Sequence, residues 1–120
     1  MATQSAPLLP TIGIYGLGIM GGTMAEVLLK RGYKVCGFDI DSKAKQRFQK
    51  HGGKFVSHSR DVATRADILI ISVSTAKALE QVTQAIVDGQ ALRKANTSPI
   101  AIETSTLTIA DKNLLAQTLK

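Results

Sequence analysis

The strongest constraint on the fold is a glycine-rich stretch between an apolar run and a helical pattern. The run Thr11–Tyr15 predicts a short buried strand, and the residues after Gly18 predict an amphipathic helix. Between them stands the sequence Gly16-Leu17-Gly18-Ile19-Met20-Gly21. The glycine spacing alone is weak support for any function. A strand, a tight glycine turn and a helix in this order, however, are typical of a dinucleotide site.

Each of the three glycines has a separate part in such a site. We expect Gly16 to allow a sharp turn off the strand, and Gly18 to let the backbone come close to a pyrophosphate. We expect Gly21 to let the helix lie tightly against the sheet. The phosphates would then meet the free N–H groups and the positive dipole end of the helix. We therefore assign cofactor binding to all six residues of the stretch.

The segment after the glycines has the pattern of an amphipathic helix from Ile19 to Arg31. Its apolar face is expected to hold Met20, Met24, Val27 and Leu28. Gly32 follows the basic residues Lys30 and Arg31, as is common where a helix ends.

An acidic residue stands where a dinucleotide site needs one. The second expected strand, Tyr33–Phe38, ends at Asp39, which lies 23 positions after Gly16. A carboxylate there can accept hydrogen bonds from the adenosine ribose hydroxyls. The alternative is a helix cap or a solvated loop carboxylate, but Asp41 and Ser42 are better placed as caps for the next helix.

Asp39 also bears on the choice of cofactor. A carboxylate near the ribose 2′ position repels the additional phosphate of NADP, for which an Arg is usual. The residue after Asp39 is Ile40, so the sequence favours NAD. The ammonium groups of Lys43 and Lys45 could partly screen the repulsion, so NADP is not excluded.

The rest of the chain continues to alternate strands and helices. Strands are expected at residues 54–56, 67–73 and 100–104, and helices at 42–50, 59–65, from about 74 to about 87, and from 109 onward. This order predicts an α/β fold of three layers, a Rossmann-type doubly wound parallel sheet built from βαβ units. Ligands of such sheets lie at the carboxyl ends of the strands, where residues 72–74 and 104–106 would join Gly16 and Asp39.

Size and composition are those of a single soluble domain. The chain has 120 residues, which suffice for one three-layer core, and no apolar run is long enough to cross a membrane. Residues 1–10 lack the pattern of a secretory signal and are expected to form a flexible tail, which leaves 11–120 as the folded domain. The single cysteine, Cys36, fits a reducing compartment such as the cytoplasm and is expected to fill the core.

The formal net charge of +6 invites a nucleic-acid interpretation, which the residue pattern does not support. The basic residues are scattered along the sequence and aromatic residues make up 4% of it, so neither a basic stripe nor a stacking platform is expected. His51, His58 and Cys36 have no partners at the spacing of metal ligands, so no metal site is expected.

Three stretches give the chain a resemblance to the β-hydroxyacid dehydrogenases, the family of 3-hydroxyisobutyrate dehydrogenase and 6-phosphogluconate dehydrogenase. Ile12–Gly21 resembles the opening IGFIGLGxMG of that family. Ala66–Ser74 is similar to its strand ADVVITMLP, and Glu103–Thr106 resembles its substrate segment DxST. Together these stretches span nearly all of the chain from residue 11 onward, from Ile12 to Thr106.

The resemblance implies roles for further residues. Val73 and Ser74 would line the cofactor at the end of a strand. Ser105 and Thr106 would donate hydrogen bonds to the carboxylate of a small β-hydroxy acid or to the nicotinamide end, with Thr106 also counted among the cofactor-binding residues. The alternative is that Ser105 and Thr106 only form a turn at the end of a strand.

The resemblance also implies that this chain carries no catalytic residue. The catalytic Lys of the family lies in a glycine-rich segment beyond residue 120, as does the helical domain that closes over the substrate and forms the dimer. Lys112 and Lys120 lack the glycine-rich context. The chain alone is therefore expected to bind cofactor and to be inactive. It also departs from the family pattern at three positions: Ser74 and Ile109 replace Pro, and Glu103 replaces Asp.

Two other functions fit part of the sequence. One is a non-catalytic or regulatory Rossmann module that binds a nucleotide, against which the Ser105-Thr106 pair counts. The other is a methyltransferase that uses S-adenosylmethionine, since that class also combines a glycine-rich turn with an acidic residue after the second strand. Gly21, inside a tightly packed helix, favours a dinucleotide instead.

Overall fold

The computed structural model describes residues 9–93, 98–104 and 117–118 of the chain. Five parallel strands form one sheet in the order β3-β2-β1-β4-β5. The strands are β1 (Ile12–Tyr15), β2 (Val35–Phe38), β3 (Lys54–Phe55), β4 (Ile68–Ile71) and β5 (Ile100–Glu103). The helices are α1 (Ile19–Lys30), α2 (Ser42–Lys50), α3 (Arg60–Arg65) and α4 (Ala76–Ala91). The predicted doubly wound parallel sheet is confirmed.

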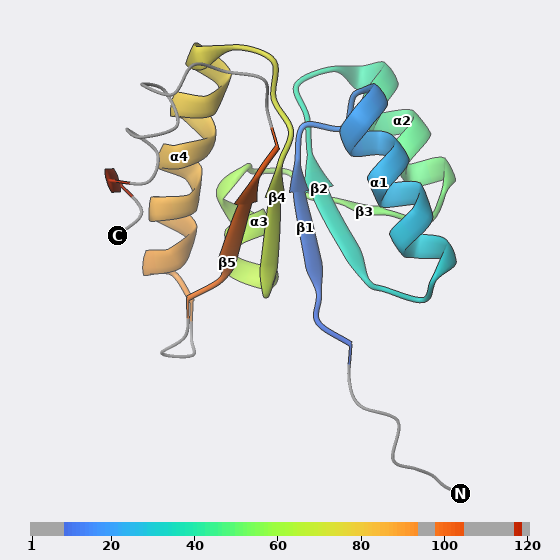
Figure 1. Cartoon of the computed structure of the whole chain (residues 1–120), viewed down its shortest axis with the longest axis horizontal. Coiled ribbons are helices and arrows are strands. Elements are labelled where there is room, and N and C mark those ends of the chain that lie inside the picture. Colours follow the sequence, from blue (N-terminus) through green and yellow to red (C-terminus); the bar gives the residue numbers. More distant parts are fainter. Residues whose placement is uncertain (1–8, 94–97, 105–116, 119–120) are drawn as a thin grey trace, which may run out of the picture.

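The helices cover both faces of the sheet, so the molecule has three layers (Figure 1). On the face of α1 and α2, Ile12 and Ile14 of β1 pack with Ala25 of α1 and Phe48 of α2. On the face of α3 and α4, Tyr15 packs with residues of both helices. Because successive side chains of a strand point to opposite faces, a central strand covered on both sides needs apolar residues throughout. That requirement explains why β1 and β4 are nearly continuous apolar runs.

The face of α1 that packs on the sheet differs from the predicted one. Met20 and Val27 are exposed, with 56% and 47% of their surface accessible, while Gly21 and Ala25 are buried. Small residues face the sheet because α1 lies close to the loop after β1. Of the predicted face, Leu28 packs against the apolar cluster beneath α1 and α2.

α4 extends further than its sequence pattern suggested. It continues through Asp88 and Gly89 to Ala91, where a looser segment was expected after Val87. Gly89 is buried, and a Cβ there would collide with the carbonyl O of Arg60. This glycine therefore lets α4 pack against α3 and does not break the helix.

The second half of the sheet ends in an exposed edge strand. β5 pairs in parallel with β4, and Ile100 and Ile102 are 65% and 46% exposed. The strand agrees with the predicted range of 100–104 to within one residue. Most of the expected final helix, which was to start near Ile109 with Thr108 as its cap, lies outside the described residues, as do residues 1–8 of the expected tail.

Candidate functional site

A cavity of about 600 Å³ opens at the carboxyl ends of the strands. The loop after β1 forms one wall, the residues after β2 and β4 form the others, and Thr104 after β5 closes one side. The described residues of all four segments that the sequence predicted at this edge therefore contribute to one cavity. Of the predicted site residues, those that line it are Gly16, Gly18, Ile19, Met20, Gly21, Asp39, Val73 and Ser74.

The three glycines of the loop differ in their surroundings. Gly16 has φ +90°, and a Cβ there would collide with the carbonyl O of Ser72 at the end of β4. A Cβ at Gly21 would collide with the carbonyl O of Gly16, so α1 can approach the loop only because this residue is glycine. A Cβ at Gly18 would meet nothing within 4 Å. Gly18 thus borders open space in the cavity, where a ligand could approach the backbone.

The N-terminus of α1 faces the same cavity with no side-chain cap. Gly18 is the N-cap residue, its position offers no side-chain cap for the N–H groups of the first turn, and no acidic residue stands in that turn. The first N–H groups of a helix have no partner within the helix, and they carry its positive dipole end. An uncapped start among glycines suits an anion such as a pyrophosphate.

Asp39 organises the glycine loop as well as lining the cavity. Its Oδ2 accepts a hydrogen bond of 2.6 Å from the backbone N–H of Leu17, and its Oδ1 accepts one of 2.9 Å from Asp41 N–H. A carboxylate has about four lone-pair sites, so these two bonds leave capacity for ribose hydroxyls. The loop-carboxylate role and the predicted ribose role are therefore compatible in one residue.

Leu17 differs from the other residues of the stretch because it lies beneath the loop. Its side chain is fully buried with the core of α1 and α2, and it is not among the residues that line the cavity. Its backbone N–H is held by Asp39. Leu17 therefore fixes the shape of the loop through its buried side chain and its bound backbone N–H.

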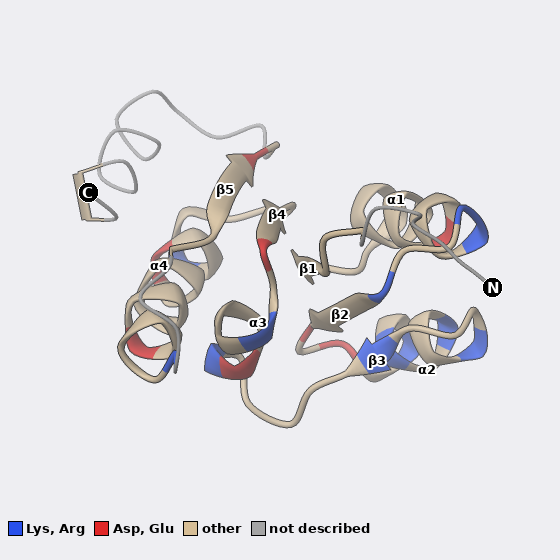
Figure 2. Cartoon of the chain, turned by 90° about the horizontal axis from the view of Figure 1, so that it is seen from below, with Lys and Arg blue, Asp and Glu red and all other residues tan. Residues whose placement is uncertain are grey.

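The two lysines that could affect the cofactor choice lie outside the cavity. Asp41 caps α2 by accepting a hydrogen bond from Lys43 N–H, as predicted. The ammonium of Lys45 lies 5.0 Å from the centre of the Phe55 ring, which is a cation–π arrangement. Neither lysine is among the cavity-lining residues of the described chain. Figure 2 shows Lys and Arg in α1, α2 and β3, which lie in one half of the molecule, and also in α3 in the other half.

Tyr15 and Ser59 are site residues that the sequence analysis missed. The buried Tyr15 hydroxyl donates a hydrogen bond of 2.6 Å to the carbonyl O of Ser59, and both residues line the cavity. Burial raises the pKa of this phenol above its ordinary value. The bond ties the segment before α3 to the end of β1. A tyrosine directly before the first glycine was the available signal.

The substrate segment is described only in part. Thr104 lines the cavity, and both its N–H and its hydroxyl donate hydrogen bonds of 2.9 Å to the carbonyl O of Ile71. Ser105 and Thr106 lie outside the described residues, so their predicted roles stay predictions.

Residues 11–120 match the NAD binding domain of 6-phosphogluconate dehydrogenase. The chain belongs to this family. The glycine loop, Asp39 and the end of β4 are thus the parts of a 6-phosphogluconate dehydrogenase-type NAD-binding domain that meet at its cavity.

Relatives of the domain include human mitochondrial 3-hydroxyisobutyrate dehydrogenase, which is 35% identical over 107 residues. That match covers 88% of this chain and 31% of the human protein. The solved Mycobacterium tuberculosis 3-hydroxyisobutyrate dehydrogenase with L-serine has a TM-score of 0.78 at 26% identity, over 92% of this chain and 37% of that one. The NAD-binding domain thus spans about a third of these relatives.

Two further structures share the fold of the NAD-binding domain. The imine reductase of Myxococcus stipitatus, in complex with NADP⁺, has a TM-score of 0.75 at 17% identity, over 91% of this chain and 38% of that one. Its V8 variant, in complex with NAD⁺, has a TM-score of 0.76 at 17% identity, over 92% and 38%. At this identity the likeness concerns the fold alone, and the same fold accommodates both cofactors.

No group of three or more His, Cys, Asp or Glu residues in the described part of the NAD-binding domain could hold a metal ion. None of the described helices is both long and apolar enough to cross a membrane.

Cys36 gives a pH-dependent prediction for the stability of the domain. Burial raises the pKa of its thiol from 9.0 to about 11. Between these values the unfolded chain has lost a proton that the folded chain keeps, so the free energy of unfolding falls as the pH rises through this window. Each unit of difference between the folded and unfolded pKa corresponds to about 1.4 kcal/mol. We therefore expect the contribution of the thiol to the free energy of unfolding to fall by roughly 1 kcal/mol from about pH 8 to about pH 10.

Urea unfolding at both pH values measures this loss. Cys36→Ala serves as the control, because it keeps every other group that titrates in the same range. The free energy of unfolding of the unchanged chain should fall by more than that of Cys36→Ala. Equal falls would mean that the thiol is not protected by burial.

Proposed function

We propose that this chain is the cofactor-binding part of an oxidoreductase that transfers a hydride between a nicotinamide cofactor and a β-hydroxy acid. The observation that carries the proposal is the contrast within the glycine loop. Two glycines are enclosed by backbone, while Gly18 and the uncapped start of α1 border an open cavity. Backbone N–H groups held open in this way fit a pyrophosphate.

The residues present fit a dinucleotide along its length. Gly16–Gly21 would hold the pyrophosphate, Asp39 would accept the ribose hydroxyls, and Val73 and Ser74 would lie against the part of the cofactor beyond the phosphates. A bound nicotinamide cofactor supplies the hydride acceptor or donor. The part of this chain is to bind and orient that carrier through a preformed loop.

We propose that NAD is preferred over NADP. Asp39 places a carboxylate in the cavity, the neighbouring Ile40 is 90% exposed, and Lys45 is directed to Phe55. No cationic side chain among the described lining residues would therefore balance a 2′-phosphate. Replacing Asp39 should remove a contact with the ribose and so weaken the binding of NAD. Loss of its negative charge should favour the binding of NADP.

Asp39→Asn tests this preference, because an amide oxygen can still accept the hydrogen bond from Leu17 N–H while the charge is lost. We expect the ratio of the NADH and NADPH dissociation constants to shift toward NADPH by about tenfold, the effect of roughly 1.4 kcal/mol. Fluorescence titration of the two reduced cofactors measures the ratio. Equal changes in both constants would contradict the preference.

The remaining features belong to the whole protein. We propose that Ser105 and Thr106 donate hydrogen bonds to the substrate carboxylate, and that the Lys acid–base residue lies outside this chain. The chain alone would then be inactive, and any homo-oligomer would form through the helical domain of the family. The buried single thiol supports our assignment to a reducing compartment such as the cytoplasm.

A thermal-shift panel with NADH, NADPH and S-adenosylmethionine tests the proposed class of ligand. A ligand at about 100 times its dissociation constant stabilises the folded state by about 2.7 kcal/mol, which raises the melting temperature of a small domain by roughly 10 °C. We expect this increase with NADH and a smaller one with NADPH. Stabilisation by S-adenosylmethionine alone would favour the methyltransferase interpretation, and no stabilisation by any of the three would contradict cofactor binding.

A further inference from the structure

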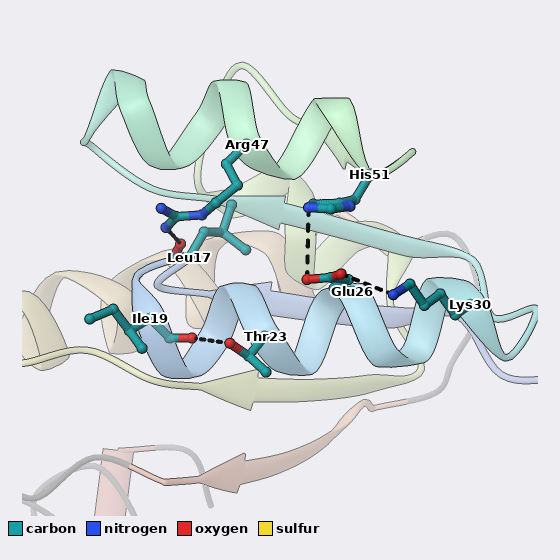
Figure 3. A network of polar contacts seen from close by, with 7 residues as sticks. All are labelled: Leu17, Ile19, Thr23, Glu26, Lys30, Arg47 and His51. Atoms are coloured by element: carbon teal, nitrogen blue, oxygen red, sulfur yellow. Dashed lines mark hydrogen bonds and ion pairs between the residues drawn. The ribbon is translucent and has the colours of Figure 1, made fainter.

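Helix α2 holds the glycine loop through a side chain that does not line the cavity. The Arg47 guanidinium of α2 donates a hydrogen bond of 3.1 Å from Nη2 to the carbonyl O of Leu17 (Figure 3). The two residues are 30 positions apart in the sequence, and the bond is partly buried. The carbonyl that Arg47 contacts belongs to the peptide that joins Leu17 to Gly18, the glycine beside the open part of the cavity.

The other groups of Leu17 are held as well. Its N–H donates to Asp39 Oδ2 at 2.6 Å, and its side chain is fully buried. The residue between Gly16 and Gly18 is therefore held at its N–H from the end of β2, at its C=O from α2, and at its side chain by the core. Of these three attachments, the one from Arg47 bears directly on the orientation of the Leu17–Gly18 peptide.

Gly22 gives an independent sign that this carbonyl is kept accessible. It lies just after the glycine stretch, and none of the roles given above requires it. A Cβ at Gly22 would lie 2.9 Å from the Leu17 carbonyl O and 3.7 Å from Arg47 Nε. The absence of a side chain at Gly22 thus leaves the room in which the guanidinium meets the Leu17 carbonyl.

We propose that Arg47 is a positioning residue for the pyrophosphate of the cofactor, which it does not itself touch. The guanidinium fixes the orientation of the Leu17–Gly18 peptide and places a positive charge behind the loop. Because a peptide whose C=O accepts a hydrogen bond is polarised, its N–H becomes a stronger donor, and here that N–H belongs to Gly18. This inference rests on the proposed function, since it concerns the same dinucleotide.

Arg47→Met tests the proposal, because methionine keeps an apolar side chain and removes both the charge and the donor. Lys50→Met is the matched control, since it removes one positive charge from the same exposed helix. We expect Arg47→Met to weaken NADH binding by roughly three- to tenfold, because the Gly18 N–H becomes a weaker donor and a nearby positive charge is removed. Adenosine, which has no phosphate, should bind within about twofold of its original affinity. Lys50→Met should leave both ligands unchanged, and Arg47→Lys should restore part of the NADH affinity.

The amide signal of Gly18 in a ¹H–¹⁵N NMR spectrum provides a second readout without ligand. We expect it to move in Arg47→Met and to stay in place in Lys50→Met. If Arg47→Met weakened NADH and adenosine equally, or left the Gly18 signal unmoved, Arg47 would have only a structural role and the proposal would be overturned. If the unchanged chain bound NADH and Arg47→Met bound it as tightly, the inference alone would fail. Failure of the unchanged chain to bind NADH would overturn the proposed function, and this inference with it.

Discussion

Gly18→Ala is expected to fold like the unchanged chain and to lose most of its affinity for NADH. A Cβ at Gly18 would meet no protein atom within 4 Å, and the φ of this residue is −68°, which alanine adopts readily. The methyl group would instead occupy the place where a pyrophosphate comes closest to the backbone. Loss of one charge-assisted hydrogen bond of about 1.5–3 kcal/mol weakens binding roughly 10- to 100-fold.

Fold and binding have to be measured on the same Gly18→Ala sample. Alanine gains about 0.4–1 kcal/mol from a less flexible unfolded chain and loses a similar amount as a poorer N-cap, so the free energy of unfolding should change by less than about 1 kcal/mol. Urea unfolding measures that quantity, and fluorescence titration measures the NADH dissociation constant. A stable Gly18→Ala variant with undiminished NADH affinity would place the pyrophosphate somewhere else.

Gly16→Ala is expected to have the opposite profile, with its main effect on stability. At φ +90° an alanine is strained by about 1–3 kcal/mol. Its Cβ would also collide with the carbonyl O of Ser72, which is backbone at the end of β4 and cannot move aside alone. Overpacking of this kind adds about 1–3 kcal/mol, so the total of roughly 2–6 kcal/mol is a large part of the stability of a small domain.

Gly32→Ala separates the two contributions to that loss. Gly32 has the same φ of +90°, but a Cβ there would meet nothing within 4 Å. Gly32→Ala should therefore lose only the backbone term of about 1–3 kcal/mol. If urea unfolding gave equal losses for Gly16→Ala and Gly32→Ala, the close contact between the glycine loop and β4 would not be significant.

The fold could be predicted from the sequence because its signals are local and consistent. The apolar runs at β1 and β4 are nearly continuous, as strands covered on both faces require, and Asp41 accepts the capping hydrogen bond expected of it. The four segments at the carboxyl edge follow from the parallel order of the strands. Knowledge of that edge was enough to place the glycine loop, Asp39 and the end of β4 in one cavity.

The parts that were missed depend on contacts between distant residues. Gly89 looked like a helix end, because only the packed structure reveals how close the backbone of Arg60 lies. The apolar pattern of α1 predicted a buried face with Met20 and Val27. In the structure α1 lies so close to the glycine loop that Gly21 and Ala25 face the sheet instead. The contact of Arg47 with Leu17 spans 30 positions and has no periodic or motif signal.

A ¹H–¹⁵N NMR titration of the chain with NADH tests most directly the claim that a dinucleotide binds at the glycine loop. We expect the largest shifts in the backbone signals of Gly16–Gly21, Asp39, Ile40 and Ser72–Ser74. The signals of Gly52 and Gly53, which follow α2 and do not line the cavity, should stay in place. Saturation by NADH without signal shifts at the glycine loop, or with the largest shifts elsewhere, would contradict binding of a dinucleotide at this loop.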